Sequence, residues 1–205
     1  MQPICTVNAN LTLVEKKAIQ KLQITKNVTE LEYRGPVCMS LLSLVQKYIA
    51  TLGENPKELS LIIAGVVTRL AQQITKKFAE EYVLLIIRAT QPHNASNIPR
   101  WHMDGHFFIA ERSVYKSVFT VKGPMTRFAE VSDQNTFDHL IKAGERNTIQ
   151  NEINSNAYKR EDMRIRVGLM TAVREIFPAG QEEIVAFLVE NDDAVVHSEP
   201  ILSEP

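Results

Sequence analysis

The sequence predicts an α+β fold in which helices pack outside an antiparallel sheet or barrel. Apolar residues with helical spacing dominate the first part of the chain, whereas short β-branched or alternating apolar runs dominate from Tyr82 onward. Because the helices precede the strands rather than alternating with them, the two kinds of element should form separate layers. We therefore expect a helical N-terminal support region over residues 1–81 and a strand-rich region over residues 82–205.

Three helices are expected in the first region. Thr12 and Glu15 have the spacing of a capping box, which predicts a helix that continues to Leu22. A break at Gly35-Pro36 precedes a second helix over residues 37–52. The third helix is expected over residues 56–81, where one apolar stripe faces a core. That stripe consists of Leu59, Ile62, Ile63, Val66, Val67, Leu70, Ile74 and Phe78.

The second region is expected to hold mainly strands. Residues 82–87 form a continuous apolar run typical of a buried strand, and the apolar patterns at 114–122, 182–190 and 194–197 predict further strands. A short helix should end at Gly144, followed by a polar loop or lid over residues 147–156. Residues 165–176 fit either a strand or a helix.

Composition excludes several classes of protein. The chain has 205 residues, of which 44% are hydrophobic and 23% charged, as in ordinary globular domains. A net charge of −1 argues against a general affinity for nucleic acid or anionic membranes. No apolar run approaches the ~20 residues of a membrane span, and no secretory signal pattern begins the chain. The two cysteines cannot form a disulfide framework, so we expect a cytoplasmic protein. The oligomeric state stays open.

One short motif carries chemistry. His102 and Asp104 lie two residues apart at the start of an expected strand, so their side chains share a face. His197, on a second expected strand, is the best candidate for a third ligand. Two histidines and one carboxylate form the facial triad that suits non-haem Fe(II) and leaves open coordination positions. The alternatives are a hydrogen-bonded His–Asp pair and an unrelated core or surface histidine.

Two segments resemble a known family. Pro99-Arg100-Trp101-His102-Met103-Asp104-Gly105 is similar to the metal-binding strand of the cupin-like Fe(II)/2-oxoglutarate-dependent oxygenases, and Val195-Val196-His197-Ser198 is similar to their distal-histidine strand. The segment from Ser117 to Pro124 also resembles uncharacterised bacterial cupin-like proteins. The resemblance implies a double-stranded β-helix, that is, a jelly-roll or cupin-like barrel. It further implies His102, Asp104 and His197 as metal ligands and catalytic residues, Fe(II) and 2-oxoglutarate as cofactors, and hydroxylation or demethylation of a small-molecule or peptide substrate.

The chain departs from that family at one point. Members usually carry an Arg or Lys about ten residues after the distal histidine to bind the far carboxylate of 2-oxoglutarate, but Ser198 to Pro205 contain neither. Lys116 and Lys122, on one face of the strand after the motif, are the cofactor-binding candidates. Three arginines stay open because a guanidinium binds a carboxylate with two hydrogen bonds: Arg127, Arg166 and Arg174.

Neighbours of the triad have expected roles as well. His106 shares the strand parity of His102 and Asp104, so it is a candidate to line the site or be a further ligand; the alternative is a histidine that is exposed or only supports a ligand. Trp101 has the opposite parity and should pack in a core. Ser198 could hydrogen-bond to a ligand.

Other chemistries lack their sequence signals. The chain contains no G-x-S-x-G nucleophile elbow and no Walker or Rossmann glycine pattern. Three functions therefore remain: a 2-oxoglutarate-dependent oxygenase, another metal-dependent cupin-like enzyme that does not use 2-oxoglutarate, and a non-catalytic module that binds a ligand or a protein.

Overall fold

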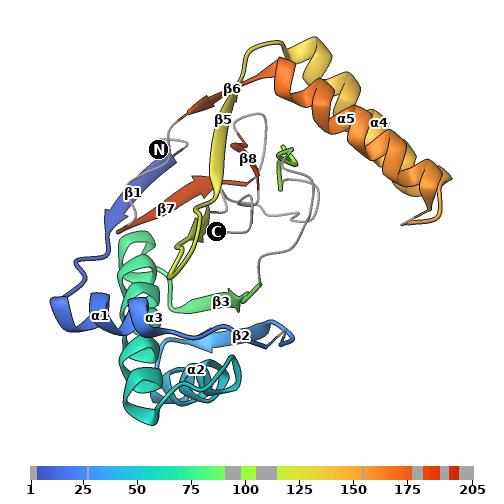
Figure 1. Cartoon of the computed structure of the whole chain (residues 1–205). Helices are drawn as coiled ribbons and strands as arrows, with labels where there is room; N and C mark the ends of the chain where they lie inside the picture. The colour runs from blue at the N-terminus through green and yellow to red at the C-terminus, as the bar shows by residue number, and fades with distance from the viewer. Residues whose placement is uncertain are drawn as a thin grey trace. The chain divides into compact units, whose positions relative to one another are not determined.

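The structure is a computed structural model that describes residues 4–26, 28–90, 98–104, 115–153, 155–176, 182–189 and 194–198. Within these ranges the chain forms an α+β fold with five helices and small sheets whose described pairings are antiparallel (Figure 1). The chain divides into two compact units, one made of residues 8–93 and the other of residues 1–7 with 94–203. None of the described helices has both the length and the apolar character that a membrane crossing requires.

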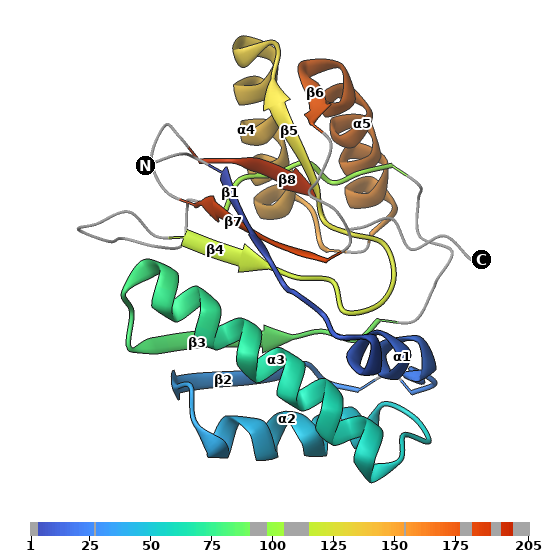
Figure 2. The same ribbon diagram turned by 90° about the vertical axis from the view of Figure 1, so that its left-hand side faces the viewer.

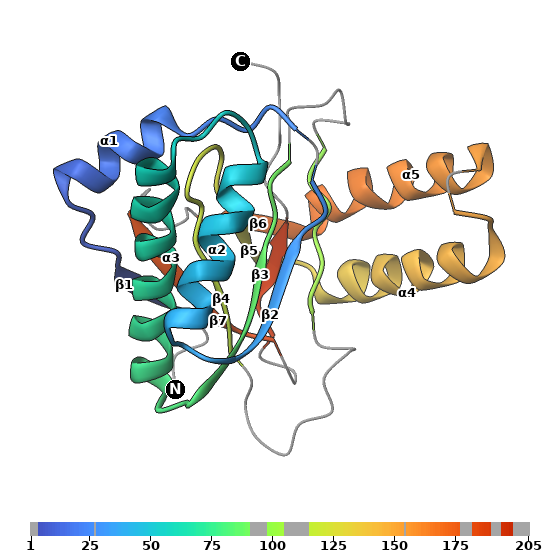
Figure 3. The same ribbon diagram turned by 90° about the horizontal axis from the view of Figure 1, so that it is seen from below.

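The unit of residues 8–93 packs three helices with a two-stranded ribbon (Figure 3). The helices are α1 (Leu13–Lys21), α2 (Met39–Thr51) and α3 (Lys57–Phe78), and all three predicted helices are thereby confirmed. Thr12 and Glu15 form the expected capping box. Helix α3 ends three residues before the predicted residue 81, because Ala79 adopts a left-handed conformation and its N–H bonds back to the last turn.

The ribbon of this unit pairs β2 (Leu31–Pro36) with β3 (Tyr82–Ile87). Strand β3 has the predicted bounds, although it lies in the region that the sequence assigned to the barrel and here pairs with β2. Strand β2 was not expected, because its Gly-Pro end indicated a chain break. The alternating exposure from Leu31 to Pro36 shows that the segment is extended up to that break.

The other unit contains two three-stranded sheets (Figure 2). The strand orders are β1-β7-β4 and β6-β5-β8, with the bounds β1 (Ile4–Asn8), β4 (Tyr115–Val118), β5 (Arg127–Val131), β6 (Val173–Ile176), β7 (Glu183–Leu188) and β8 (Val196–Ser198). Side chains from both sheets share one core, in which Phe128 of β5 meets Phe187 of β7 edge to face with 5.2 Å between ring centroids.

A helical hairpin covers the opposite face of the β6-β5-β8 sheet. It consists of α4 (Gln134–Gln150) and α5 (Asn156–Ala172), and its apolar side chains pack with Trp101, Ala129 and Val196. Adjacent residues of a strand point to opposite faces of the sheet. Ala129 and Val196 therefore face the helical hairpin, whereas their sequence neighbours Phe128 and His197 face the core between the two sheets. The predicted core position of Trp101 is confirmed.

Two local predictions fail in this hairpin. The expected helix does not stop at Gly144 but continues to Gln150, so the predicted loop over 147–156 begins four residues late and its described part lies between Gln150 and Asn156. Contacts between the two helices explain why α4 continues beyond Gly144. The Asn147 side chain is buried and donates to the carbonyl oxygen of Tyr158, while the Asn151 amide donates to Asn147. Polar residues that favour loops in isolation here join two helices. The ambiguous segment 165–176 is helix to Ala172 and strand beyond it.

The described strands do not close into a barrel. The two sheets of this unit are layered around a shared core, which is the coarse arrangement that a jelly-roll also has. What is shown within the described ranges is therefore a mixed α+β fold with layered antiparallel sheets.

Candidate metal centre

Two histidines far apart in sequence meet on neighbouring extended segments. The backbone N–H of His102 donates to the carbonyl oxygen of His197, and the N–H of His197 donates to that of His102, both at 2.9 Å. The imidazole ring centroids lie 4.3 Å apart. A bridge that exchanges both hydrogen bonds fixes the two residues directly opposite each other on one face.

Asp104 joins the two histidines. It lies two residues beyond His102, and its Oδ1 is 3.7 Å from Nε2 of His102, while its Oδ2 is 3.3 Å from Nε2 of His197. One ligand atom from each of the three residues lies within 4.8 Å of the others. The structure thus brings together the three residues that the sequence singled out.

Backbone carbonyls orient both imidazoles. Nδ1 of His102 donates to the carbonyl oxygen of Arg100 at 2.9 Å, and Nδ1 of His197 donates to that of Val195 at 3.1 Å. A proton held on Nδ1 leaves Nε2 unprotonated in the neutral ring, and this tautomer can bind a metal through Nε2. Nε2 of His197 is buried and has no hydrogen-bond partner, although it lies near Asp104.

The centre has an apolar wall and an open side. His197 is 3% exposed, and the Phe187 ring lies 4.8 Å from its imidazole, with the Phe128 ring at 6.5 Å. The side chains of His102 and Asp104 are 24% and 20% exposed. A ligand would therefore approach from the side of His102 and Asp104.

Lys116 forms an ion pair with the carboxylate of Asp104. It lies on β4 opposite Phe187, and its Nζ is 2.5 Å from Oδ2 of Asp104 and 5.9 Å from the Phe187 ring centroid. Burial alone would raise the pKa of Asp104, but the nearby His197 imidazole and the hydrogen-bonded Lys116 ammonium outweigh burial and hold that pKa well below its usual range. Asp104 is thus an anion at neutral pH.

The donor set fits a divalent transition metal. Donors that bind one ion at about 2.1 Å and at right angles are about 3 Å apart. The carboxylate of Asp104 lies 3.7 Å from Nε2 of His102 and 3.3 Å from Nε2 of His197, and the whole donor set lies within 4.8 Å, so the side chains would have to close around the ion. Two imidazoles and one carboxylate suit Fe(II), and the same set also accepts neighbouring divalent metals. The buried, unpartnered Nε2 of His197 is the strongest sign of fit, because an unsatisfied buried nitrogen is costly unless a ligand occupies it.

The other residues that the sequence suggested for the site differ in their surroundings. Lys122 is exposed beyond the end of β4, and cofactor binding by Lys116 or Lys122 stays a prediction. The three arginines are engaged by acidic side chains: Arg127 by Glu175, Arg166 by Asp162 and Arg174 by Glu130. Arg127 also lies over the Trp101 ring, 5.4 Å from its centroid. Ser198 is buried, and His106 lies outside the described residues.

Sequence reasoning treated Lys116 only as an anchor for an anionic cofactor and missed its contact with Asp104. No local pattern of residues predicts this contact, because Lys116 and Asp104 are too far apart in the sequence for helical or strand spacing to relate them. Only the pairing of β4 with β7 places this lysine beside the triad.

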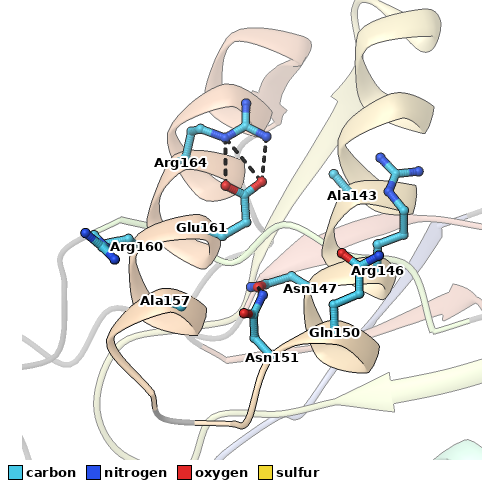
Figure 4. A pocket seen from close by; sticks show the side chains of 9 residues that line it. All are labelled: Ala143, Arg146, Asn147, Gln150, Asn151, Ala157, Arg160, Glu161 and Arg164. Atoms are coloured by element: carbon cyan, nitrogen blue, oxygen red, sulfur yellow. Dashed lines mark hydrogen bonds and ion pairs between the residues drawn. The ribbon is translucent and has the colours of Figure 1, made fainter.

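A cleft of about 390 Å³ lies between α4 and α5 (Figure 4). Asn147 and Asn151 extend into the space between the helices, whereas Arg160 points away from α4 and Arg164 is bound to Glu161. The cleft contains no residue of the triad. Its arginine side chains do not converge on one point.

No protein-family model matches this chain, and comparisons with curated proteins and with solved structures found no significant match.

Proposed function

We propose that His102, Asp104 and His197 hold Fe(II) and that the protein is a 2-oxoglutarate-dependent oxygenase acting as a hydroxylase or demethylase. The observation that carries the proposal is the meeting of these three ligand groups on paired extended segments, with one imidazole nitrogen buried and lacking a hydrogen-bond partner. The layered sheets support a cupin-like, jelly-roll arrangement as the corresponding fold.

Each residue has a defined part in this proposal. His102 and His197 present Nε2 because their Nδ1 protons are held by backbone carbonyls, and Asp104 supplies a negatively charged oxygen. Phe187 and Phe128 exclude water behind His197. Lys116 supplies a cation at the edge of the site that an acidic co-substrate would use. Fe(II) in such a site supplies O₂ activation coupled to the oxidative decarboxylation of 2-oxoglutarate.

Metal analysis under anaerobic conditions tests the proposal. We expect about one Fe(II) per chain, lost in His102→Ala and in Asp104→Ala, and succinate release from 2-oxoglutarate and O₂ by the iron-loaded protein. His139→Ala is the matched control, because this exposed histidine on α4 lies outside the triad. Iron content that is the same in the triad variants and in the wild type would refute the site.

A second candidate function is a metal-dependent cupin-like enzyme that does not use 2-oxoglutarate. One observation favours it: the three arginines considered as anchors are held by acidic side chains. Stoichiometric metal without succinate release would support this second function. A non-catalytic binding module is the remaining alternative, and it predicts either that no metal binds or that bound metal has no effect. For all three functions we propose the cytoplasm, in keeping with the two free cysteines.

A further inference from the structure

We infer that Lys116 is a built-in competitor for the metal, so that the centre takes up its cation weakly until an anion draws this lysine away from Asp104. The inference rests on the proposed metal site and adds to it a coupling between the binding of metal and the binding of an anion. It assigns Lys116 a role in the metal-free protein that is distinct from holding a co-substrate.

The inference depends on one oxygen atom, Oδ2 of Asp104, which lies close to both Lys116 and His197. Nζ of Lys116 is 2.5 Å from Oδ2 of Asp104, and the same Oδ2 is the carboxylate oxygen 3.3 Å from the buried Nε2 of His197. A metal ion bound by His197 and the nearer oxygen of Asp104 would therefore use the oxygen that the ammonium now occupies. The lysine is a substitute cation, and it balances the negative charge of a carboxylate that is only 20% exposed.

Two cations on one carboxylate repel each other, so metal entry must weaken the bond between lysine and aspartate. The side chain of Lys116 is 43% exposed and can turn outward at little cost in solvation. An anion that binds both the metal and the released ammonium would offset this repulsion. By linkage, the anion must then raise the affinity for the metal by the same factor by which the metal raises the affinity for the anion.

A comparison of variants tests the competition without using activity. Co(II) serves as an oxygen-stable probe, and its binding is followed by calorimetry and by quenching of Trp101, the single tryptophan, which adjoins His102. Lys116→Met removes the ammonium and keeps the chain length. In the absence of any anionic ligand we expect this variant to bind Co(II) roughly tenfold more tightly than the wild type. A tenfold effect corresponds to the loss of one charged hydrogen bond that is weakened by solvent, because Lys116 is partly exposed.

Two further variants serve as controls. Lys116→Arg keeps the positive charge and should retain the weak binding of the wild type. Lys142→Met makes the same change at an exposed position on α4 and should leave the Co(II) affinity unchanged. Adding 2-oxoglutarate should raise the Co(II) affinity of the wild type by a larger factor than that of Lys116→Met.

The alternative role gives the opposite sign. If Lys116 instead holds Asp104 in position for the metal, Lys116→Met will bind Co(II) less tightly than the wild type, and the inference is overturned. An unchanged affinity also overturns it, while the metal site itself stands. If neither the wild type nor Lys116→Met binds Co(II), both the inference and the proposed function fail.

Discussion

Phe187→Ala should be among the most destabilising single substitutions in this protein. The ring is fully buried between the two sheets, where it packs edge to face against Phe128 and lies 4.8 Å from the His197 imidazole. Removing a buried phenylalanine ring costs about 3–5 kcal/mol, because transfer free energy is lost and a cavity remains. Because the free energy of unfolding of a whole domain is only about 5–15 kcal/mol, this substitution would remove a large fraction of it.

Urea unfolding followed by Trp101 fluorescence measures this loss, because Trp101 is buried in the same unit and therefore reports its unfolding. Ile149→Ala is the matched control: this side chain is 84% exposed, and its truncation should change the free energy of unfolding by less than about 0.5 kcal/mol. A loss of under about 1.5 kcal/mol in Phe187→Ala would refute the shared core between the sheets, and with it the apolar wall behind His197.

Three further predictions concern other parts of the chain. Hydrogen bonds from Ser40 lower the pKa of the exposed Cys38 thiol to about 7, so its alkylation rate, followed by peptide mass spectrometry, should rise through pH 7 as the reactive thiolate forms. Ser40→Ala should move that midpoint upward, and an unmoved midpoint contradicts the assignment. Asn147→Ala should cost about 0.5–1.5 kcal/mol in urea unfolding, because it removes the buried hydrogen bond that joins α4 to α5; a neutral effect would contradict the helical hairpin. Thr12→Ala should cost about 1 kcal/mol through loss of the helix cap, measured by thermal unfolding, whereas the wild-type midpoint would count against the cap.

The sequence by itself determined the elements whose signals are local. The capping box at Thr12 and the apolar stripe of α3 depend on residues within a few positions of one another, so both follow from helical spacing. The pair His102 and Asp104 also follows from spacing, since residues two apart on an extended chain share a face.

Only the tertiary structure decided the features that depend on partners distant in sequence. It placed His197 opposite His102, paired β3 with β2, and brought Lys116 to Asp104 through the pairing of β4 with β7. It also made helix of the Asn-rich segment around Asn147, because a hydrogen bond to a second helix satisfies that side chain. Pairing between distant segments is set by which faces can be buried together, and no local pattern of residues contains that information.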